Sequence, residues 1–142
     1  MNADRHFLDT NVFAYTFDLR DTRKRKIADA LIVSSLRDES GVASFQVVHE
    51  FVNLAVRETV PGFGAAEAAL YISETFAKLI LVQSSLNLCL KALSIRHRYQ
   101  FHWYDSLIVA AALDSGCKTL FSEDLQHRQV IDGLKIVNPF YE

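Results

Sequence analysis

The side chains whose positions suggest shared chemistry are four carboxylates: Asp9, Glu50, Asp105 and Asp124. Asp9 directly follows a short apolar run, and Asp124 comes shortly after another, so both stand where a strand is expected to end. Glu50 falls in the early turns of an expected helix, and Asp105 opens a strongly apolar one. Ligands of an open parallel sheet bind in the crevice outside the carboxyl ends of the strands. The four acids are therefore predicted to face one crevice.

Carboxylates gathered in this way call for a cation. They repel one another, and some would take up protons unless a positive charge compensated them. The set contains no histidine or thiolate, and oxygen ligands alone suit the hard ions Mg²⁺ or Mn²⁺. These ions bind through a few carboxylates together with substrate phosphate, and they activate water for phosphodiester cleavage. The set therefore predicts a Mg²⁺- or Mn²⁺-dependent nuclease.

Each acid also has an ordinary structural interpretation when it is taken alone. Asp9 could cap a helix beginning at Thr10, and Asp105 could be a plain cap of the apolar helix. Glu50 could lie at a helix boundary with its carboxylate in water, and Asp124 could be a turn residue. Only the combination of all four favours the metal site.

Two other acids serve as negative controls. Asp114 lies about 13 Å along the helix from Asp105 and on its opposite face. Glu58 lies about 12 Å beyond Glu50 along its own expected helix, by the same helical rise per residue. Neither is expected to reach the site, and both are expected on the surface.

The elements that must position these acids follow from the alternation of short apolar runs with longer segments of helical periodicity. The alternation predicts a three-layer α/β/α sandwich with a central, mainly parallel sheet of about five short strands. Strands are expected at residues 6–8, 42–44, 79–82, 119–121 and 135–137. Helices are expected at residues 22–37, from Ser44 to about 55, at 65–77, at 85–98, and through the apolar run 107–113.

Length and composition indicate one domain that covers residues 1–142. Half of the residues are hydrophobic and 23% are charged, which is typical of a globular protein. Cys89 and Cys117 do not form a disulfide framework or a zinc-finger spacing, so both are expected to be reduced thiols. No apolar run approaches the length of a membrane span, and the cytoplasm is the expected location.

The charge of the chain bears on nucleic-acid binding mainly through its distribution. A net charge of −2 argues against a protein that binds RNA through a general basic surface. A basic run at residues 20–26 and a second cluster near 96–102 could still contact an RNA backbone, although solvated helix ends are the ordinary interpretation of both. The residues concerned are Arg20, Arg23, Lys24, Arg25, Lys26, Arg96 and Arg98. His6 and His49 flank proposed site acids, and neither is assigned any chemistry.

The acids and their neighbours resemble the PIN-domain ribonucleases, and within them the VapC-like toxins of toxin–antitoxin pairs. The resemblance spans nearly the whole chain and rests on four motifs in order: residues 7–12 (FLDTNV), 44–51 (SFQVVHEF), 104–112 (YDSLIVAAA) and 120–125 (LFSEDL). Each motif alone is weak, but four in order are strong. Glu123 adjoins Asp124, so either could be the fourth acid. The family pattern of a hydroxyl, any residue and then Asp favours Asp124.

The resemblance implies a PIN-like fold and a metal-dependent endoribonuclease that is the toxin of a type II toxin–antitoxin pair. It implies that the four acids bind the metal, with Asp9 and Asp105 as the main direct ligands, and that Asn11 and Ser122 orient them. It also implies an RNA substrate, an antitoxin that blocks the site, and a homodimer.

Three alternatives remain open at this point. An aspartyl-phosphate phosphatase also begins with a strand followed by Asp, but its second Asp is replaced here by Asn11. An RNA- or protein-binding module could keep the fold without turnover. A nuclease directed at DNA could use the same acids, because they read phosphates and carry no information on the 2′-hydroxyl.

Overall fold

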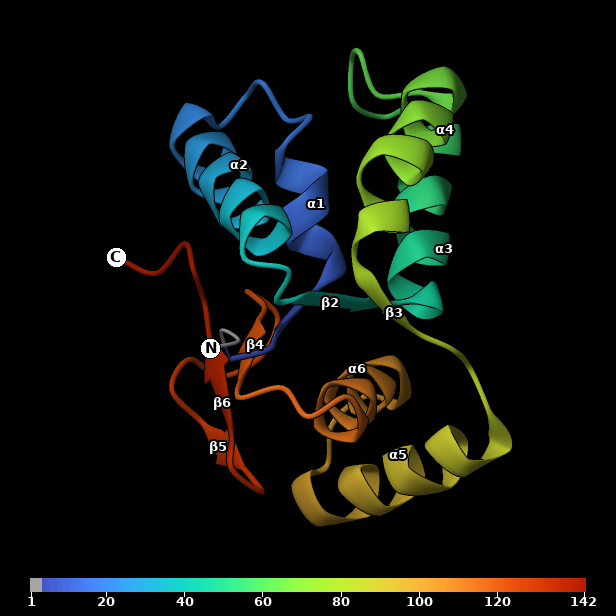
Figure 1. Cartoon of the computed structure of the whole chain (residues 1–142), viewed down its shortest axis with the longest axis vertical. Helices are drawn as coiled ribbons and strands as arrows, with labels where there is room; N and C mark the ends of the chain where they lie inside the picture. Colours follow the sequence, from blue (N-terminus) through green and yellow to red (C-terminus); the bar gives the residue numbers. More distant parts are fainter. Residues whose placement is uncertain (1–3) are drawn as a thin grey trace.

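Short apolar runs form the central sheet of the computed structural model, which describes residues 4–142 (Figure 1). The strands are β1 (His6–Leu8), β2 (Gly41–Ser44), β3 (Ile80–Val82), β4 (Thr119–Phe121), β5 (Val130–Ile131) and β6 (Leu134–Val137). Their order across the sheet is β3-β2-β1-β4-β6-β5, and all neighbours are parallel except β5, which is antiparallel to β6. The predicted mainly parallel sheet is confirmed, with one more strand than expected.

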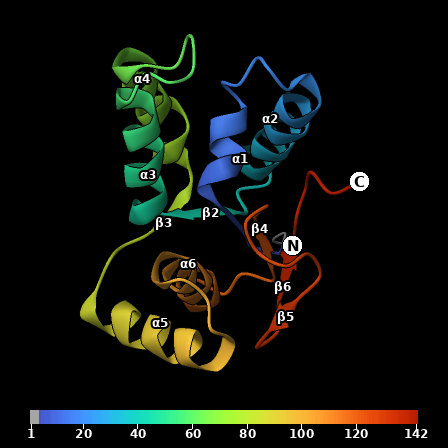
Figure 2. The same ribbon diagram turned by 180° about the vertical axis from the view of Figure 1, so that it is seen from behind.

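Helices cover both faces of this sheet (Figures 1 and 2). One face carries α1 (Thr10–Tyr15), α2 (Thr22–Arg37), α3 (Phe45–Val56) and α4 (Ala65–Glu74), which leads into the 3₁₀ turn η1 (Phe76–Lys78). The other face carries α5 (Leu86–Tyr99) and α6 (Trp103–Asp114). The three-layer α/β/α sandwich predicted from the sequence is therefore confirmed.

Side-chain caps fix where three of these helices begin. The side chains of Asp21, Ser44 and Ser85 accept hydrogen bonds from backbone N–H groups in the first turns of α2, α3 and α5. Such caps satisfy donors that have no partner within the helix. The cap at Ser44 fixes the start of the helix that carries Glu50, where the sequence predicted that a helix begins.

Helix α6 is buried because it packs against α5 on one side and against β2 and β4 on the other. Its residues 108–112 are all buried, which agrees with the nearly uniform apolar character of this segment. A helix held on several sides has little freedom to shift. The position of Asp105 in its first turn is therefore set by the core.

Two elements were not predicted from the sequence. α1 has six residues, too few for a clear helical period, and it begins because Asp9 caps it. β5 has two residues and pairs with β6 across a turn that contains Gly133, whose φ is +87°. Both elements depend on local turns and caps, which leave no periodic pattern in the sequence.

The order of the strands reverses its direction at β1. The chain passes from β1 to β2 and β3 on one side, and later to β4 and β6 on the other. The carboxyl ends of β1 and β4 therefore border the topological switch point, where ligands of open α/β sheets bind.

The cysteines and the membrane prediction can be compared with the described part of the chain. Cys89 is half-buried and Cys117 is buried, and both are free thiols. Among residues 4–142, none of the helices combines the length and the apolar character that a membrane span requires.

Candidate active site

Asp9 lies at the end of β1 and is almost fully buried, with 4% of its surface exposed. The backbone N–H of Thr10 donates to its Oδ1 at 2.7 Å, and Ser122 Oγ donates to its Oδ2 at 2.7 Å. The first contact makes Asp9 the N-cap of α1, so its ordinary structural interpretation also applies. The second contact connects β1 to the loop after β4. Asp9 is thus both a helix cap and a member of the site at the switch point.

Asp124 is held beside Asp9 by the two side chains that the sequence analysis selected for orientation. Asn11 Nδ2 donates to Asp124 Oδ2 at 3.1 Å, and the backbone N–H of Asp124 donates to Ser122 Oγ at 3.1 Å. Ser122 is fully buried and contacts both Asp9 and the Asp124 backbone. Its hydroxyl therefore fixes the loop after β4 relative to the end of β1.

Glu123 faces away from Asp124 and has partners of its own. Its carboxylate accepts hydrogen bonds from Lys24 Nζ at 3.0 Å and from the Tyr15 hydroxyl. These contacts tie the loop to α2 and to the end of α1. Of the two neighbouring acids, Asp124 is the one that faces Asn11 and the other site acids.

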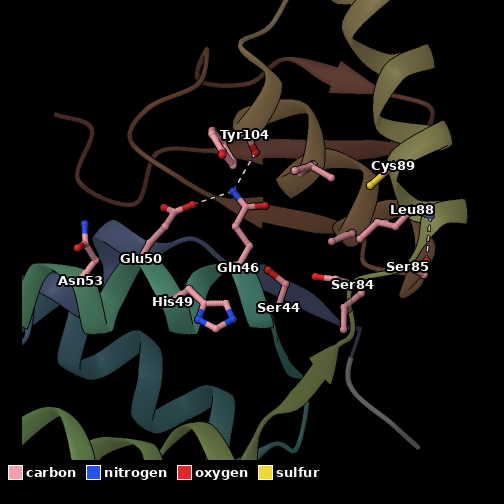
Figure 3. A pocket seen from close by; sticks show the side chains of 13 residues that line it. Ser44, Gln46, His49, Glu50, Asn53, Ser84, Ser85, Leu88, Cys89 and Tyr104 are labelled. Atoms are coloured by element: carbon pink, nitrogen blue, oxygen red, sulfur yellow. Dashed lines mark hydrogen bonds between the residues drawn. The ribbon is translucent and has the colours of Figure 1, made fainter.

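Glu50 projects from α3 beside Gln46, as Figure 3 shows. Thr10 Oγ1 donates to Glu50 Oε2 at 2.9 Å, and Gln46 Nε2 donates to Glu50 Oε1 at 2.7 Å. Gln46 Nε2 also donates to the backbone carbonyl of Tyr104 at 3.1 Å, which ties α3 to the start of α6. The sequence analysis missed both Thr10 and Gln46. The only available indications were that Thr10 follows Asp9 and that Gln46 precedes Glu50 by one helical turn.

The acids interact electrostatically across the site. Burial raises the pKa of Asp9 to about 7, and the charges of Asp124 and Glu50 act in the same direction. The pKa of Asp105 is also raised, first by burial and then by the charges of Asp124 and Glu50. Asp9 and Asp105 thus share the electrostatic influence of the same two carboxylates.

The donor set fits a hard divalent cation in chemistry, but the acids do not form a finished coordination shell. In the described chain, residues 4–142, no three carboxylate, imidazole or thiol groups lie close enough together to hold one ion. Neutral donors from Ser122, Asn11, Thr10 and Gln46 stand between the carboxylates instead. The Oδ1 atom of Asn11 is buried and has no hydrogen-bond partner. A site of charged oxygens with a free buried acceptor suits a hydrated cation.

The two control acids lie outside this region. Asp114 ends α6 and pairs with Lys91 of α5, at the opposite end of the helix from Asp105. Glu58 is exposed just beyond the end of α3. Helix geometry thus separates Asp105 and Glu50 from other acids nearby in the sequence.

Several of the basic residues considered for RNA binding have acidic partners. The pairs are Arg20 with Asp18 at 2.8 Å, Arg23 with Glu142 at 3.5 Å, Lys24 with Glu123 at 3.0 Å and Arg98 with Asp132 at 2.7 Å. Lys24 is connected to the site through its contact with Glu123. Arg25 is half-buried, whereas Lys26 and Arg96 are exposed. A role for any of them in binding RNA stays a prediction.

Comparison with known proteins places these features in context. The family model described as "PIN domain" matches residues 6–132. No curated protein matches the chain in sequence.

Three solved structures have a similar fold. A toxin–antitoxin complex from Klebsiella pneumoniae has a TM-score of 0.71 at 17% identity, covering 96% of this chain and 98% of that one. VapC20 of Mycobacterium tuberculosis, described as a toxin that cleaves the sarcin–ricin loop, has a TM-score of 0.65 at 21% identity, covering 84% and 91%. DNA-bound VapBC from Salmonella typhimurium has a TM-score of 0.65 at 15% identity, covering 94% and 97%. At these identities the likeness shows a shared fold.

Proposed function

The chain belongs to the PIN domain family, and from this premise we propose that it is a divalent-metal-dependent endoribonuclease. The observation that carries the proposal is a set of contacts beside the switch point of the sheet: Thr10 and Ser122 connect Asp9 to Glu50 and to the Asp124 backbone, and Gln46 ties Glu50 to the first turn of α6, which carries Asp105. Burial and the neighbouring carboxylates make the charges of Asp9 and Asp105 costly, which a structural role alone does not explain. A site that binds a cation and phosphate uses them.

In this proposal the four acids hold Mg²⁺ or Mn²⁺, and Asp9 and Asp105 are the main direct ligands. When bound, such an ion lowers the pKa of a coordinated water and neutralises charge on the phosphate. The ion would compete with Ser122, Asn11, Thr10 and Gln46 for the carboxylate oxygens. Asp9 is buried and Asp105 is half-buried, and both have raised pKa values, so their ionised forms would gain most from a positive charge.

The remaining residues of the site act by orientation. Ser122 and the Thr10 N–H fix the two oxygens of Asp9, and Asn11 fixes Asp124. Gln46 fixes Glu50 and, through the Tyr104 carbonyl, holds α3 at a set position relative to the first turn of α6. Because Asp105 lies in that turn, Gln46 also sets the separation of Glu50 and Asp105. Partners of this kind commonly change activity about 10- to 100-fold when they are removed.

We further propose that the chain is the toxin of a toxin–antitoxin pair and acts in the cytoplasm. Structures of similar fold are described as toxin–antitoxin complexes, and one as a toxin that cleaves the sarcin–ricin loop. An antitoxin protein that covers the site and a second copy of the chain are the partners that this function implies. A small reading frame overlapping the start of this one would support the pairing.

The test is cleavage of matched single-stranded RNA and DNA of the same sequence by the purified protein. We expect RNA to be cut in Mg²⁺ or Mn²⁺ and left intact in EDTA, with DNA uncut under both conditions. Preferential cleavage of DNA would make the chain a DNA-directed nuclease. Binding of RNA without cleavage would make it a binding module, and a stable phosphate ester on Asp9 would make it a phosphatase.

A further inference from the structure

A pocket of about 610 Å³ opens beside Glu50 (Figure 3), and the other three acids are not among the residues that line it. It lies between α3, α5 and α6, at the carboxyl ends of β2 and β3, which Ser44 and Val82 mark on its wall. Asp9 and Asp124 lie beyond the corresponding ends of β1 and β4. Pocket and acids therefore share one edge of the sheet. The metal site proposed above does not use this volume.

The lining of the pocket combines an apolar interior with polar groups. Leu88 and Ala111 are buried apolar contributions from α5 and α6, and Leu107 is half-buried between them. His49 and Asn53 are exposed on α3, one turn apart on the same face, and Ser84 is exposed before α5. Pockets of this size ordinarily take small-molecule groups, whose apolar parts the lining buries and whose orientation a few polar side chains fix.

Gln46 connects the pocket to the acid site. Its Nε2 donates hydrogen bonds to Glu50 and to the backbone carbonyl of Tyr104. Figure 3 shows its carbonyl oxygen turned to the other side, into the pocket. That oxygen can accept a hydrogen bond from a ligand, while the amide nitrogen holds a catalytic acid.

Tyr104 provides an aromatic surface at the boundary between the two regions. It is 66% exposed, lines the pocket, and directly precedes Asp105. An exposed tyrosine ring is a surface on which an unstacked base of single-stranded RNA can lie.

We propose that this pocket binds one nucleobase of the RNA, turned out of the strand beside the phosphate that the acids engage. The inference rests on the proposed function and adds to it the choice of nucleotide next to the cut. The base stacks on Tyr104 over the apolar interior, and its edge donates a hydrogen bond to Gln46 Oε1. A strand that lies across the acids reaches this pocket directly, because Glu50 and Gln46 border both. This continuity favours RNA over a protein segment as the occupant.

Cys89 supplies a probe of occupancy that does not depend on cleavage. Its thiol lines the pocket, whereas Cys117 is buried elsewhere, and burial raises the pKa of the Cys117 thiol. Because the thiolate is the reactive form, iodoacetamide should alkylate Cys89 first, with Cys117 as an internal control. The rate is followed by mass spectrometry in EDTA with AMP, GMP, CMP, UMP or ribose 5-phosphate, each at about 10 mM.

We expect at least one nucleotide to slow alkylation of Cys89 about five-fold or more, and ribose 5-phosphate to have no effect. Equal rates with all additions, or equal protection by ribose 5-phosphate, would refute base binding. Protection in a protein that fails to cut RNA would overturn the proposed nuclease function and leave the pocket assignment standing. Cleavage of RNA without protection of Cys89 would leave the nuclease function standing and overturn the pocket assignment.

Substitutions then separate the pocket from the chemistry. Cys89→Trp fills the pocket and should raise KM for RNA about ten-fold while kcat changes little, since base stacking contributes on this scale. Asn87→Trp, an exposed site on the same helix outside the pocket, is the matched control and should leave both constants unchanged. Tyr104→Ala, which removes the stacking ring, should raise KM more than Tyr104→Phe, which keeps the ring.

A protein occupant would give a different pattern. Alkylation of Cys89 would then depend on the concentration of the chain, and Cys89→Trp would change its mass in solution without altering KM for RNA. Either result would overturn the proposal.

Discussion

Replacing Asp105 by asparagine should lower the rate of RNA cleavage by about a thousandfold or more, with the fold intact. The substitution keeps the shape of the side chain and removes its charge. Asp105 is half-buried, and burial together with the charges of Asp124 and Glu50 raises its pKa. The surroundings therefore disfavour the charge of Asp105 unless a cation is bound, and binding that cation is the role that asparagine cannot fill. Gel-based cleavage rates in Mn²⁺ measure the loss.

Asp114→Asn is the matched control on the same helix. Its carboxylate pairs with Lys91 far from the site, so cleavage should stay within about two-fold of the wild type. Circular dichroism of both variants checks that the fold is kept. Cleavage at the wild-type rate by a folded Asp105→Asn protein would refute the assignment of this acid.

Asp9→Asn should stabilise the protein at alkaline pH in EDTA. The pKa of Asp9 is raised by burial from 3.8 in its ordinary state to about 7 in the folded chain. A raised carboxyl pKa stabilises the folded state at pH values below the ordinary pKa of the group. This contribution is lost as the pH rises from about 4 to about 7. Above that range the buried charge costs up to about 4 kcal/mol. Relief of that cost should raise Tm by roughly 5 °C or more at pH 8, and by less at pH 5.

Thermal unfolding of the two proteins in EDTA at both pH values measures this difference. In the difference between the two proteins, the contributions of groups that titrate alike in both cancel. Mn²⁺ should raise the Tm of the wild type at pH 8 and leave Asp9→Asn nearly unchanged, because a ligand of the folded state stabilises only a protein that binds it. If the two Tm values kept the same separation at pH 5 and pH 8, Asp9 would not carry the cost assigned to it.

The fold followed from the sequence where apolar spacing was strong. The runs at residues 6–8 and 119–121 form strands at those positions, and the helix predicted at residues 22–37 has the same limits in the structure. α1 and β5 escaped prediction because a cap at Asp9 and a turn at Gly133 create them. Periodicity detects long elements and misses those made by single residues.

The four acids and two orienting residues, Asn11 and Ser122, could be selected from the sequence, but the contacts that fix Glu50 could not. Positions at strand ends indicated Asp9 and Asp124, but the contacts of Thr10 and Gln46 with Glu50 depend on side-chain geometry across separate elements. The family pattern favoured Asp124 over Glu123, but the contact that holds Glu123 comes from Lys24, which lies far away in the sequence. The pocket beside Glu50 exists only once α3, α5 and α6 are packed together.

Titration of the protein with Mn²⁺, followed by electron paramagnetic resonance of the free ion, tests most directly whether these carboxylates form one cation site. Wild-type protein and Asp114→Asn should remove the free-ion signal in proportion to their concentration. Asp9→Asn and Asp105→Asn should each weaken that uptake at least about ten-fold. Uptake of Mn²⁺ that is the same in all four proteins would contradict the account.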